Sequence, residues 1–571
     1  MRESVGRLLG GRLRSFRVLY RVFLFRVVDV ELLSADGDTV KLLGQFASVL
    51  AGISFALTAW LVLAGRLPAT VLWTMEHLLL ATTMLVVGVL AVLSWDSTFP
   101  DRRDVLVLGP LPVRTGVLFS AKLAASASAL GLAIVALNSI SGVIWPLLFI
   151  PEHAGVGGVA RSVLAYWIAM AAAGLFMFGM VLSVQWMLGQ TLPRQMFLRL
   201  APVFQVGLLG LFVGTYFAEP SLASPGAVLA PENQVLLRWL PTYWFFGFFQ
   251  QLNGSGDPAF GVLATRAWVG LGVVVVGAGL AVLLSYVRTL RKTIEEPDIL
   301  PGAKRLRWSP RLGGGLQAAV TMFSARTFAR SRQHRFLLTL YLGIGFGVIT
   351  AYVKTPMAEQ ERGSTVAAPY LAASLLFLVF AVTGVRAVFS MPIALKANWV
   401  FQTTERATAT VYGRVSRRTL LLLGYAPALT ALGVWFLTIW PLRAASEHVL
   451  VLALVGAILC EVCVYGFDKI PFTCSYLPGK GNVPAYFWGF LLLLLPVTNK
   501  AAEMEIYALG RGSRYAAMVL CLAAVWLMVR WRTTTAMNRL RGLRFEEAMP
   551  PELVALGLDG GKVAALKDRA G

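Results

Sequence analysis

The sequence predicts an all-α polytopic membrane protein, with about twelve transmembrane helices arranged as two parallel six-helix pseudo-repeats. Composition is the first reason: of 571 residues, 57% are hydrophobic and 14% are charged, which is more apolar than a soluble core of this length requires. The second reason is that about twelve apolar stretches approach the roughly 20 residues that cross a bilayer. The third is a repeated motif: Ile-Trp-Pro-Leu occurs at 144–147 and 439–442, and Glu-His follows each copy at the same spacing, at 152–153 and 447–448.

The segment before the first expected span is basic and amphipathic. Its apolar residues recur at helical spacing while its arginines fall on another face, which predicts an interfacial helix. No compact apolar run followed by a small-residue cleavage site is found there, so we expect no removable signal peptide. The apolar face comprises Phe16, Leu19, Phe23, Val27 and Val30, and the basic face comprises Arg14, Arg17 and Arg21.

The spans follow in two groups of six, separated by a long polar and basic segment. We expect four parts: a first six-span unit with its N-terminal interfacial helix (1–290), a cytoplasmic linker with an amphipathic helix (291–335), a second six-span unit (336–545) and a cytoplasmic tail (546–571). The spans are expected near residues 44–64, 74–95, 117–138, 163–188, 199–217, 267–287, 336–353, 367–390, 418–440, 449–467, 484–499 and 513–530.

The two halves align with each other over at least their first three spans. A constant shift places Pro100 on Pro392, and after one small insertion Trp145 falls on Trp440. Because each half has an even number of spans, both copies are expected to cross the membrane in the same direction. Trp followed by a helix-ending Pro suits a membrane boundary, so the motif is expected at the outer ends of the third and ninth spans.

The formal charge of +22 is explained by topology. With the N terminus inside, about 41 of the 51 Lys and Arg residues fall in cytoplasmic segments or at their edges, as the positive-inside rule requires. No segment is long enough to form a soluble nucleic-acid-binding module. We therefore expect a multi-pass protein of the plasma (inner) membrane with both termini in the cytoplasm.

The cytoplasmic loops after the second and eighth spans each contain a short apolar stretch flanked by charges. Solvent disfavours such a stretch in an ordinary loop, so a docking surface is one interpretation and a helix resting on the lipid interface is the other. The docking candidates are Asp104, Val105, Leu106, Val107, Leu108, Pro110, Pro112 and Arg114 in the first loop, and Lys396, Asn398, Trp399, Val400, Phe401 and Arg406 in the second.

An aromatic segment at 237–249 lies between the fifth and sixth expected spans. It is too short for an ordinary span, which predicts a re-entrant or surface helix at the outer interface. Trp239 and Trp244 are candidate outer-face residues, as part of either a substrate gate or a plain aromatic belt.

This pattern resembles the membrane subunits of type-2 ABC exporters. Those subunits have an interfacial helix before six spans, a coupling helix between the second and third, and a re-entrant segment between the fifth and sixth. The chain looks like two such subunits fused, and the resemblance covers nearly its whole length. The most similar local sequence is Asp104 to Lys122, with an acidic residue, an apolar run and Leu111-Pro112. The second copy has Asn398 to Phe401 in place of the Leu-Pro pattern.

The resemblance implies a separate ATPase dimer that docks on the two cytoplasmic loops. The chain itself has no GxxxxGK[ST] motif, so it is not expected to hydrolyse ATP or to act as an enzyme. No cofactor and no metal site are expected; Cys460 and Cys463 form a CxxC inside an apolar span without further ligands. The exported substrate is not specified by any motif.

Two other classes stay open. A secondary transporter can also have twelve spans in two halves, but it needs titratable groups at membrane depth. Glu461 is the clearest such group, and Asp96 and Arg386 lie at span ends.

A membrane-embedded lipid- or glycan-modifying enzyme would need converging acids, bases or ligands. Three Glu-His pairs are the only such constellation: Glu76-His77, Glu152-His153 and Glu447-His448, all expected at the outer face. The favoured explanation is structural: glutamate lies in the first turn of an inward-running helix, where its charge suits the helix dipole, and a metal-binding or proton-sensing role is the alternative.

Overall fold

The computed structural model describes most of the helical part of the chain. The described residues are 15–24, 47–56, 58–59, 69–95, 115–148, 155–219, 224–295, 315–353, 366, 368–391, 399–404, 409–467, 469–473, 483–539 and 543. Over these ranges the chain forms helices joined by turns, with no β-strand. Nine helices in the described ranges are long and apolar enough to cross a membrane. The protein is therefore an all-helical, multi-pass membrane protein.

All nine coincide with spans expected from the sequence. They are Val71–Leu93, Gly116–Leu137, Gly155–Thr191, Leu200–Ala218, Pro258–Leu280, Ala368–Val388, Thr410–Ile439, Leu442–Val464 and Gly512–Asn538.

The other three expected spans overlap further helices of the described residues. The first expected span contains a short apolar helix, Ala47–Ala56, and the seventh contains His334–Thr350. The eleventh lies in α22 (Val483–Ala508), whose second half carries Lys500, Glu503 and Glu505.

The chain forms two compact units, which we call unit 1 (residues 1–309 and 332–380) and unit 2 (310–331 and 381–571). In unit 1, α3 (Ala69–Leu93) packs against α6 (Thr115–Leu137), α8 (Gly155–Thr191) and α9 (Arg194–Ala218), and α13 (Pro258–Glu295) packs on α8. Helix α15 (Arg332–Val353) packs on α9, so contacts place it in unit 1 although the linker precedes it.

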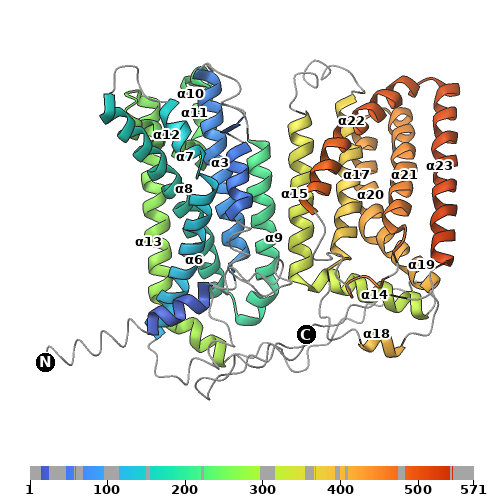
Figure 1. Ribbon diagram of the computed structural model, residues 1–571, viewed down its shortest axis with the longest axis horizontal. Coiled ribbons are helices and arrows are strands. Elements are labelled where there is room, and N and C mark those ends of the chain that lie inside the picture. The colour runs from blue at the N-terminus through green and yellow to red at the C-terminus, as the bar shows by residue number, and fades with distance from the viewer. Residues whose placement is uncertain are drawn as a thin grey trace, which may run out of the picture. The chain divides into compact units, whose positions relative to one another are not determined.

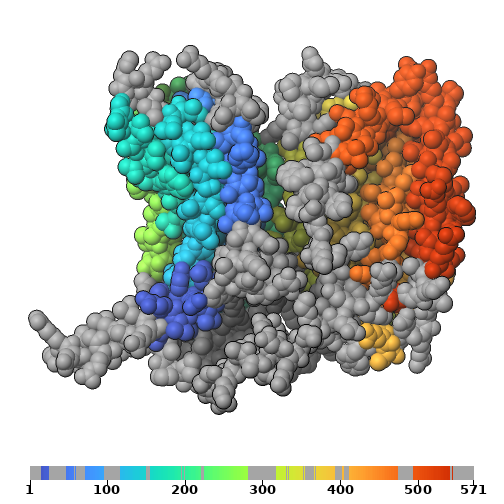
Figure 2. Space-filling view, viewed as in Figure 1, coloured from blue at the N-terminus to red at the C-terminus, as the bar shows by residue number. Residues whose placement is uncertain are grey.

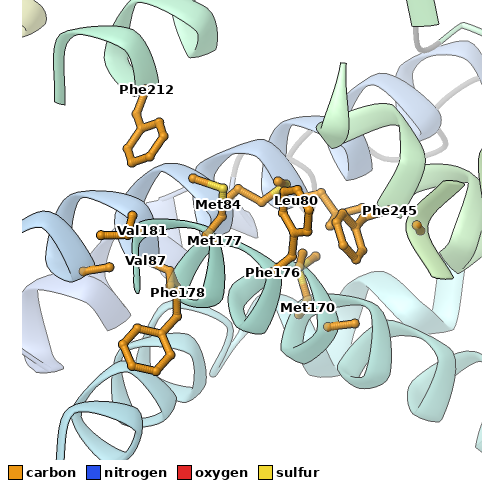
Figure 3. Packing of buried hydrophobic residues seen from close by; sticks show 14 of the residues in the cluster. Leu80, Met84, Val87, Met170, Phe176, Met177, Phe178, Val181, Phe212 and Phe245 are labelled. Carbon is orange, nitrogen blue, oxygen red and sulfur yellow. The ribbon is translucent and has the colours of Figure 1, made fainter. Parts of the chain in front are cut away.

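The core of unit 1 is built around one stripe of α3. Leu80, Met84 and Val87 recur at helical spacing and meet Phe176 and Met177 of α8, among the side chains of Figure 3. Small residues allow the close approach: an added Cβ at Gly174 of α8 would lie 2.4 Å from Ile134 of α6. Because lipid is as apolar as these side chains, close packing holds such helices together.

Short helices occupy the two ends of unit 1 (Figure 1). At one end lie α7 (Ser141–Leu148), α10 (Pro225–Leu229), α11 (Gln234–Leu237) and α12 (Pro241–Asn253). At the other end the helical segment 15–24 packs Leu19 and Phe23 on α6, with the Lys122 ammonium 5.2 Å from the Phe23 ring centroid. Arg17 and Arg21 are exposed, as the amphipathic pattern predicts.

Unit 2 has α14 (Gly315–Arg330) running across one end of its long helices (Figure 1). Val320 of α14 packs with Tyr412 and Val415 of α19 (Ala409–Leu420) and with Ile470. The helix continues from α19 through a π-turn (Leu421–Tyr425) into α20 (Ala426–Ile439). The π-turn precedes Pro427, whose ring lacks an N–H group and disturbs regular α-helical hydrogen bonding.

Helix α21 (Leu442–Val464) packs on α20 and on α23 (Gly512–Asn538). Helix α23 lies at the edge of unit 2 (Figure 2). It exposes four large apolar side chains: Leu520, Leu527, Met528 and Trp531. Such a face suits lipid in a membrane protein.

The two copies of the Ile-Trp-Pro-Leu motif have different local structures. Pro441 begins α21 directly after α20 ends at Ile439, as expected for a helix-ending Pro. Pro146 instead lies inside α7, so the expectation that it ends a helix is wrong. Pro146 is the sixth of the eight residues of α7, so its ring removes a hydrogen bond near the C-terminal end of this helix. The two copies of the motif therefore have the same sequence but different backbone structures.

Candidate functional site

Helix α12 is the most unusual element of unit 1. Pro241 begins it, where a missing N–H costs no hydrogen bond, and Gly254 ends it in the left-handed conformation with φ 99°. Phe245, Phe246, Phe248 and Phe249 are all buried. The expected short helix in this segment is confirmed, and it lies inside the unit rather than on its surface.

Close packing fixes α12 against its neighbours. An added Cβ at Gly247 would lie 2.5 Å from the Leu263 Cβ of α13, so only glycine permits this approach. Trp244 packs edge-on against Phe176 of α8, with ring centroids 6.1 Å apart. The Trp244 indole and Arg266 both donate hydrogen bonds to the Arg238 carbonyl oxygen, each at 3.0 Å, and so hold the turn before α12.

Two glutamate carboxyl groups accept hydrogen bonds from the polar side chains at the two ends of α12. Thr242 near its start donates a hydrogen bond to Oε1 of Glu219, the residue that ends α9. Gln250 near its end donates to Oε2 of Glu76 in α3, over 3.3 Å. These two hydrogen bonds join the polar side chains of α12 to α9 and to α3.

His77 follows Glu76 in α3 and approaches Glu219. Its ring stacks on Tyr243 of α12 with centroids 4.1 Å apart, and its Nε2 is 3.6 Å from Oε1 of Glu219. That separation is an ion-pair distance and is too long for a hydrogen bond. We call Glu76, His77, Glu219, Thr242 and Gln250 the α12 polar cluster.

A second polar chain lies deeper along α3. The Tyr166 hydroxyl donates to Oδ1 of Asn138 at 2.8 Å, and Nδ2 of Asn138 donates to the Thr83 hydroxyl at 3.1 Å. Tyr166 also lies 3.3 Å from the Ser141 hydroxyl, which is 3.2 Å from that of Ser54. Hydroxyl and amide groups therefore connect α3, α8 and the turn between α6 and α7 inside the apolar core.

Unit 2 holds a separate His–Glu pair. Nδ1 of His448 in α21 lies 2.6 Å from Oε1 of Glu505 in α22, and the side chains are 0% and 1% exposed. Phe436 and Trp440 of the α20 end surround the imidazole, with centroids 4.7 and 5.6 Å away. Glu447 instead pairs with Arg443 at 3.1 Å, near the surface.

The opposite end of α21 carries a third polar contact. Glu461 forms an ion pair with Arg417 of α19, over 3.2 Å. Arg386 of α17 (Ala368–Val388) donates to the Cys463 carbonyl oxygen at 2.7 Å and lies 4.3 Å from the Phe467 ring centroid. Glu461 and the span-end residue Arg386 thus have partners within unit 2, and the other span-end residue, Asp96, lies outside the described residues.

The docking candidates of the first loop, Asp104 through Arg114, lie outside the described residues, as do Lys396, Asn398 and Arg406. Trp399, Val400 and Phe401 begin a six-residue helix, α18 (Trp399–Thr404). The Phe401 ring packs edge-on against Phe323 of α14, with centroids 5.2 Å apart. Phe401 therefore contributes to packing inside unit 2.

Among the outer-face candidates, Glu152 and His153 also lie outside the described residues. Trp239 is 79% exposed, whereas Trp244 of α12 is partly buried and packs on Phe176 of α8. The sequence paired His448 with its neighbour Glu447, but the structure pairs it with Glu505. The sequence analysis did not predict a site role for four further polar residues: Glu219, Thr242, Gln250 and Glu505. The signal that could have indicated them is a single polar residue within an apolar helix.

The clusters offer carboxylates, imidazoles, hydroxyls and amides, but no group of three or more metal ligands occurs within the part of the chain that the structure describes. No protein-family model, curated protein or solved structure matches this chain. The candidate sites of this chain are therefore described from the positions and contacts of their own residues.

Proposed function

We propose that this protein is the membrane-spanning permease of an ATP-driven exporter of the ABC type, with two six-span repeats fused in one chain. The observation that carries the proposal is α12, a short buried aromatic helix between the fifth and sixth expected spans. The resemblance implies such a re-entrant element at this position. The amphipathic segment 15–24 lies at the other end of unit 1, which supports a cytoplasmic position for it and an outer position for α12 (Figure 1).

Two helices, α14 and α18, give further support to the proposal. Helix α14 precedes α15 as the segment 15–24 precedes the first expected span, and α18 follows α17 where a coupling helix is expected. An ATPase dimer docks on the loops 104–114 and 396–406, and its closure moves the two repeats against each other. The protein lies in the plasma (inner) membrane with both termini inside.

Association with an ATPase tests this proposal. We expect an ATPase to co-purify with the full-length protein from its native membrane and to be lost from the variant Leu106→Asp with Trp399→Asp. Trp239→Asp, which changes an exposed aromatic residue between α11 and α12, is the matched control and should retain the ATPase. A wild-type protein that brings down no ATPase would contradict the proposal.

Ion-coupled transport is a second candidate, because the structure buries more titratable groups in apolar helices than the sequence suggested. Glu76, Glu461 and Glu505 are each less than 5% exposed. Such groups are costly in a membrane and mark ion or proton pathways. Transport abolished by a protonophore and insensitive to ATP depletion would favour this candidate.

A further inference from the structure

Glu76 is a buried carboxyl group without a charged partner. It lies in the second turn of α3, inside the span Val71–Leu93, and is 1% exposed. Its Oε2 accepts one hydrogen bond, from Gln250, whereas its Oε1 is buried and has no hydrogen-bond partner in the described part of the chain. The amide of Gln250 is neutral, so this bond does not compensate a negative charge.

The other buried carboxyl groups have basic partners. Glu461 faces Arg417 at 3.2 Å, and Glu505 faces His448 at 2.6 Å. Among the described residues, no Lys or Arg forms an ion pair with Glu76. The adjacent imidazole of His77 approaches Glu219 instead.

The basic side chains described on α6 and α8, which pack on α3, have other partners. Lys122 of α6 lies over the Phe23 ring, and Arg161 of α8 donates to the Leu252 carbonyl oxygen. The described titratable side chains on α3 and its packing partners, besides Glu76, are His77, Lys122 of α6, Arg161 and Tyr166 of α8, Tyr216 of α9, Glu219 at its end and Tyr243 of α12.

An unpaired carboxylate in these surroundings costs far more free energy than a neutral carboxylic acid that lacks one hydrogen bond. We propose that Glu76 is a proton-binding site: it is held as a carboxylic acid while α12 covers it, and it releases the proton to water when α12 is displaced. The bond that breaks is the carboxyl O–H, and the product is a carboxylate that water can solvate. Gln250 couples the protonation of Glu76 to the position of α12, because its side-chain amide donates the hydrogen bond that joins α12 to Glu76.

This proposal goes beyond the proposed function and does not depend on the energy source. Whether ATP or an ion gradient drives transport, displacement of α12 would change the number of protons bound to unit 1. It would also explain why a glutamate occupies this buried position within a span, where an apolar side chain would be more stable.

Infrared spectroscopy of the purified full-length protein tests the protonation directly. A protonated carboxyl group in an apolar site has a carbonyl absorption that a carboxylate lacks. We expect Glu76→Gln to lose one such band at neutral pH, and we expect no loss in Glu503→Gln, which changes an exposed carboxylate paired with Lys500. An unchanged carboxyl band in Glu76→Gln overturns the proposal.

A second measurement needs no variant and so remains decisive if Glu76→Gln does not fold. A carboxylic acid transfers its proton to a nitrogen of dicyclohexylcarbodiimide while its oxygen bonds to the central carbodiimide carbon. The acyl group of this O-acylisourea then moves from oxygen to nitrogen, which breaks the acyl–oxygen bond and leaves a stable N-acylurea. We expect peptide mass spectrometry of the labelled wild-type protein to place this adduct on Glu76 and not on Glu461, which is buried beside Arg417. Absence of the adduct from Glu76 overturns the proposal.

Discussion

Nδ1 of His448 lies 2.6 Å from Oε1 of Glu505, and this contact joins α21 to α22 inside unit 2. Glu447, the sequence neighbour of His448, points to a different environment, where it accepts hydrogen bonds from Arg443 and from the Gly510 amide. The two side chains of this Glu-His dipeptide therefore have separate partners. Its two residues hold different helices in place.

The His448–Glu505 contact should stabilise unit 2. We expect Glu505→Ala to lower the free energy of unfolding by about 3 kcal/mol, because it leaves the other half of a buried polar pair without its partner. The double variant with His448→Ala should lose less than the sum of the two single variants. Unfolding in mixed micelles with increasing denaturing detergent, followed by circular dichroism, provides the measurement.

Glu503 is the matched control for this prediction. It lies on the same helix, is exposed and pairs with Lys500 at 2.7 Å. Exposed pairs of this kind contribute little, so Glu503→Ala should change the free energy by less than about 0.5 kcal/mol. Strictly additive effects of the His448 and Glu505 substitutions would show that the two side chains do not interact.

Gly247 should be intolerant of any side chain. A Cβ there would lie 2.5 Å from the Leu263 Cβ and 3.3 Å from the Phe260 carbonyl oxygen, so α12 and α13 must separate. We expect Gly247→Ala to destabilise the protein by about 1–3 kcal/mol, the usual range for overpacking. Gly261→Ala, on α13 in open space, should be neutral or slightly stabilising. Equal thermal midpoints for both variants would contradict the close approach of α12.

The Tyr166 hydroxyl should contribute to stability through Asn138. Tyr166→Phe removes the hydrogen bond to Oδ1 of Asn138, at 2.8 Å, without creating a large cavity. Side-chain hydrogen bonds between membrane helices contribute on the order of 1 kcal/mol, so a loss of that size is expected. Tyr341→Phe, outside this network, is a control whose thermal midpoint should move less; a larger shift in the control would disprove the assignment.

Apolar length and composition were sufficient to predict the nine spanning helices, because each needs only local hydrogen bonds and an apolar surface. The same information predicted a short helix near Trp244, whose boundaries at Pro241 and Gly254 depend on local backbone chemistry. The structure does not show the internal repeat, and the two Ile-Trp-Pro-Leu copies differ locally. The repeat stays a prediction from sequence.

Partners that are distant in the chain could not be predicted from one sequence. Gln250 meets Glu76, and Glu505 meets His448, only because separate helices bring them together. Periodicity assigns a residue to a helix face but does not say which helix faces it. The docking role expected for the two cytoplasmic loops also stays a prediction, because it concerns a second protein.

The Arg417–Glu461 ion pair provides a test of how α19 is held against α21. The guanidinium lies 3.2 Å from Oε1 of Glu461, and the side chains are 19% and 5% exposed. Arg417→Gln removes the positive charge and leaves a buried carboxylate, so we expect a loss of about 3 kcal/mol in the free energy of unfolding. Glu461→Gln added to Arg417→Gln removes that carboxylate and should recover much of the loss. Arg414→Gln, one turn earlier and exposed, should have little effect. Failure of Glu461→Gln to rescue Arg417→Gln would show that Arg417 acts through contacts other than this pair.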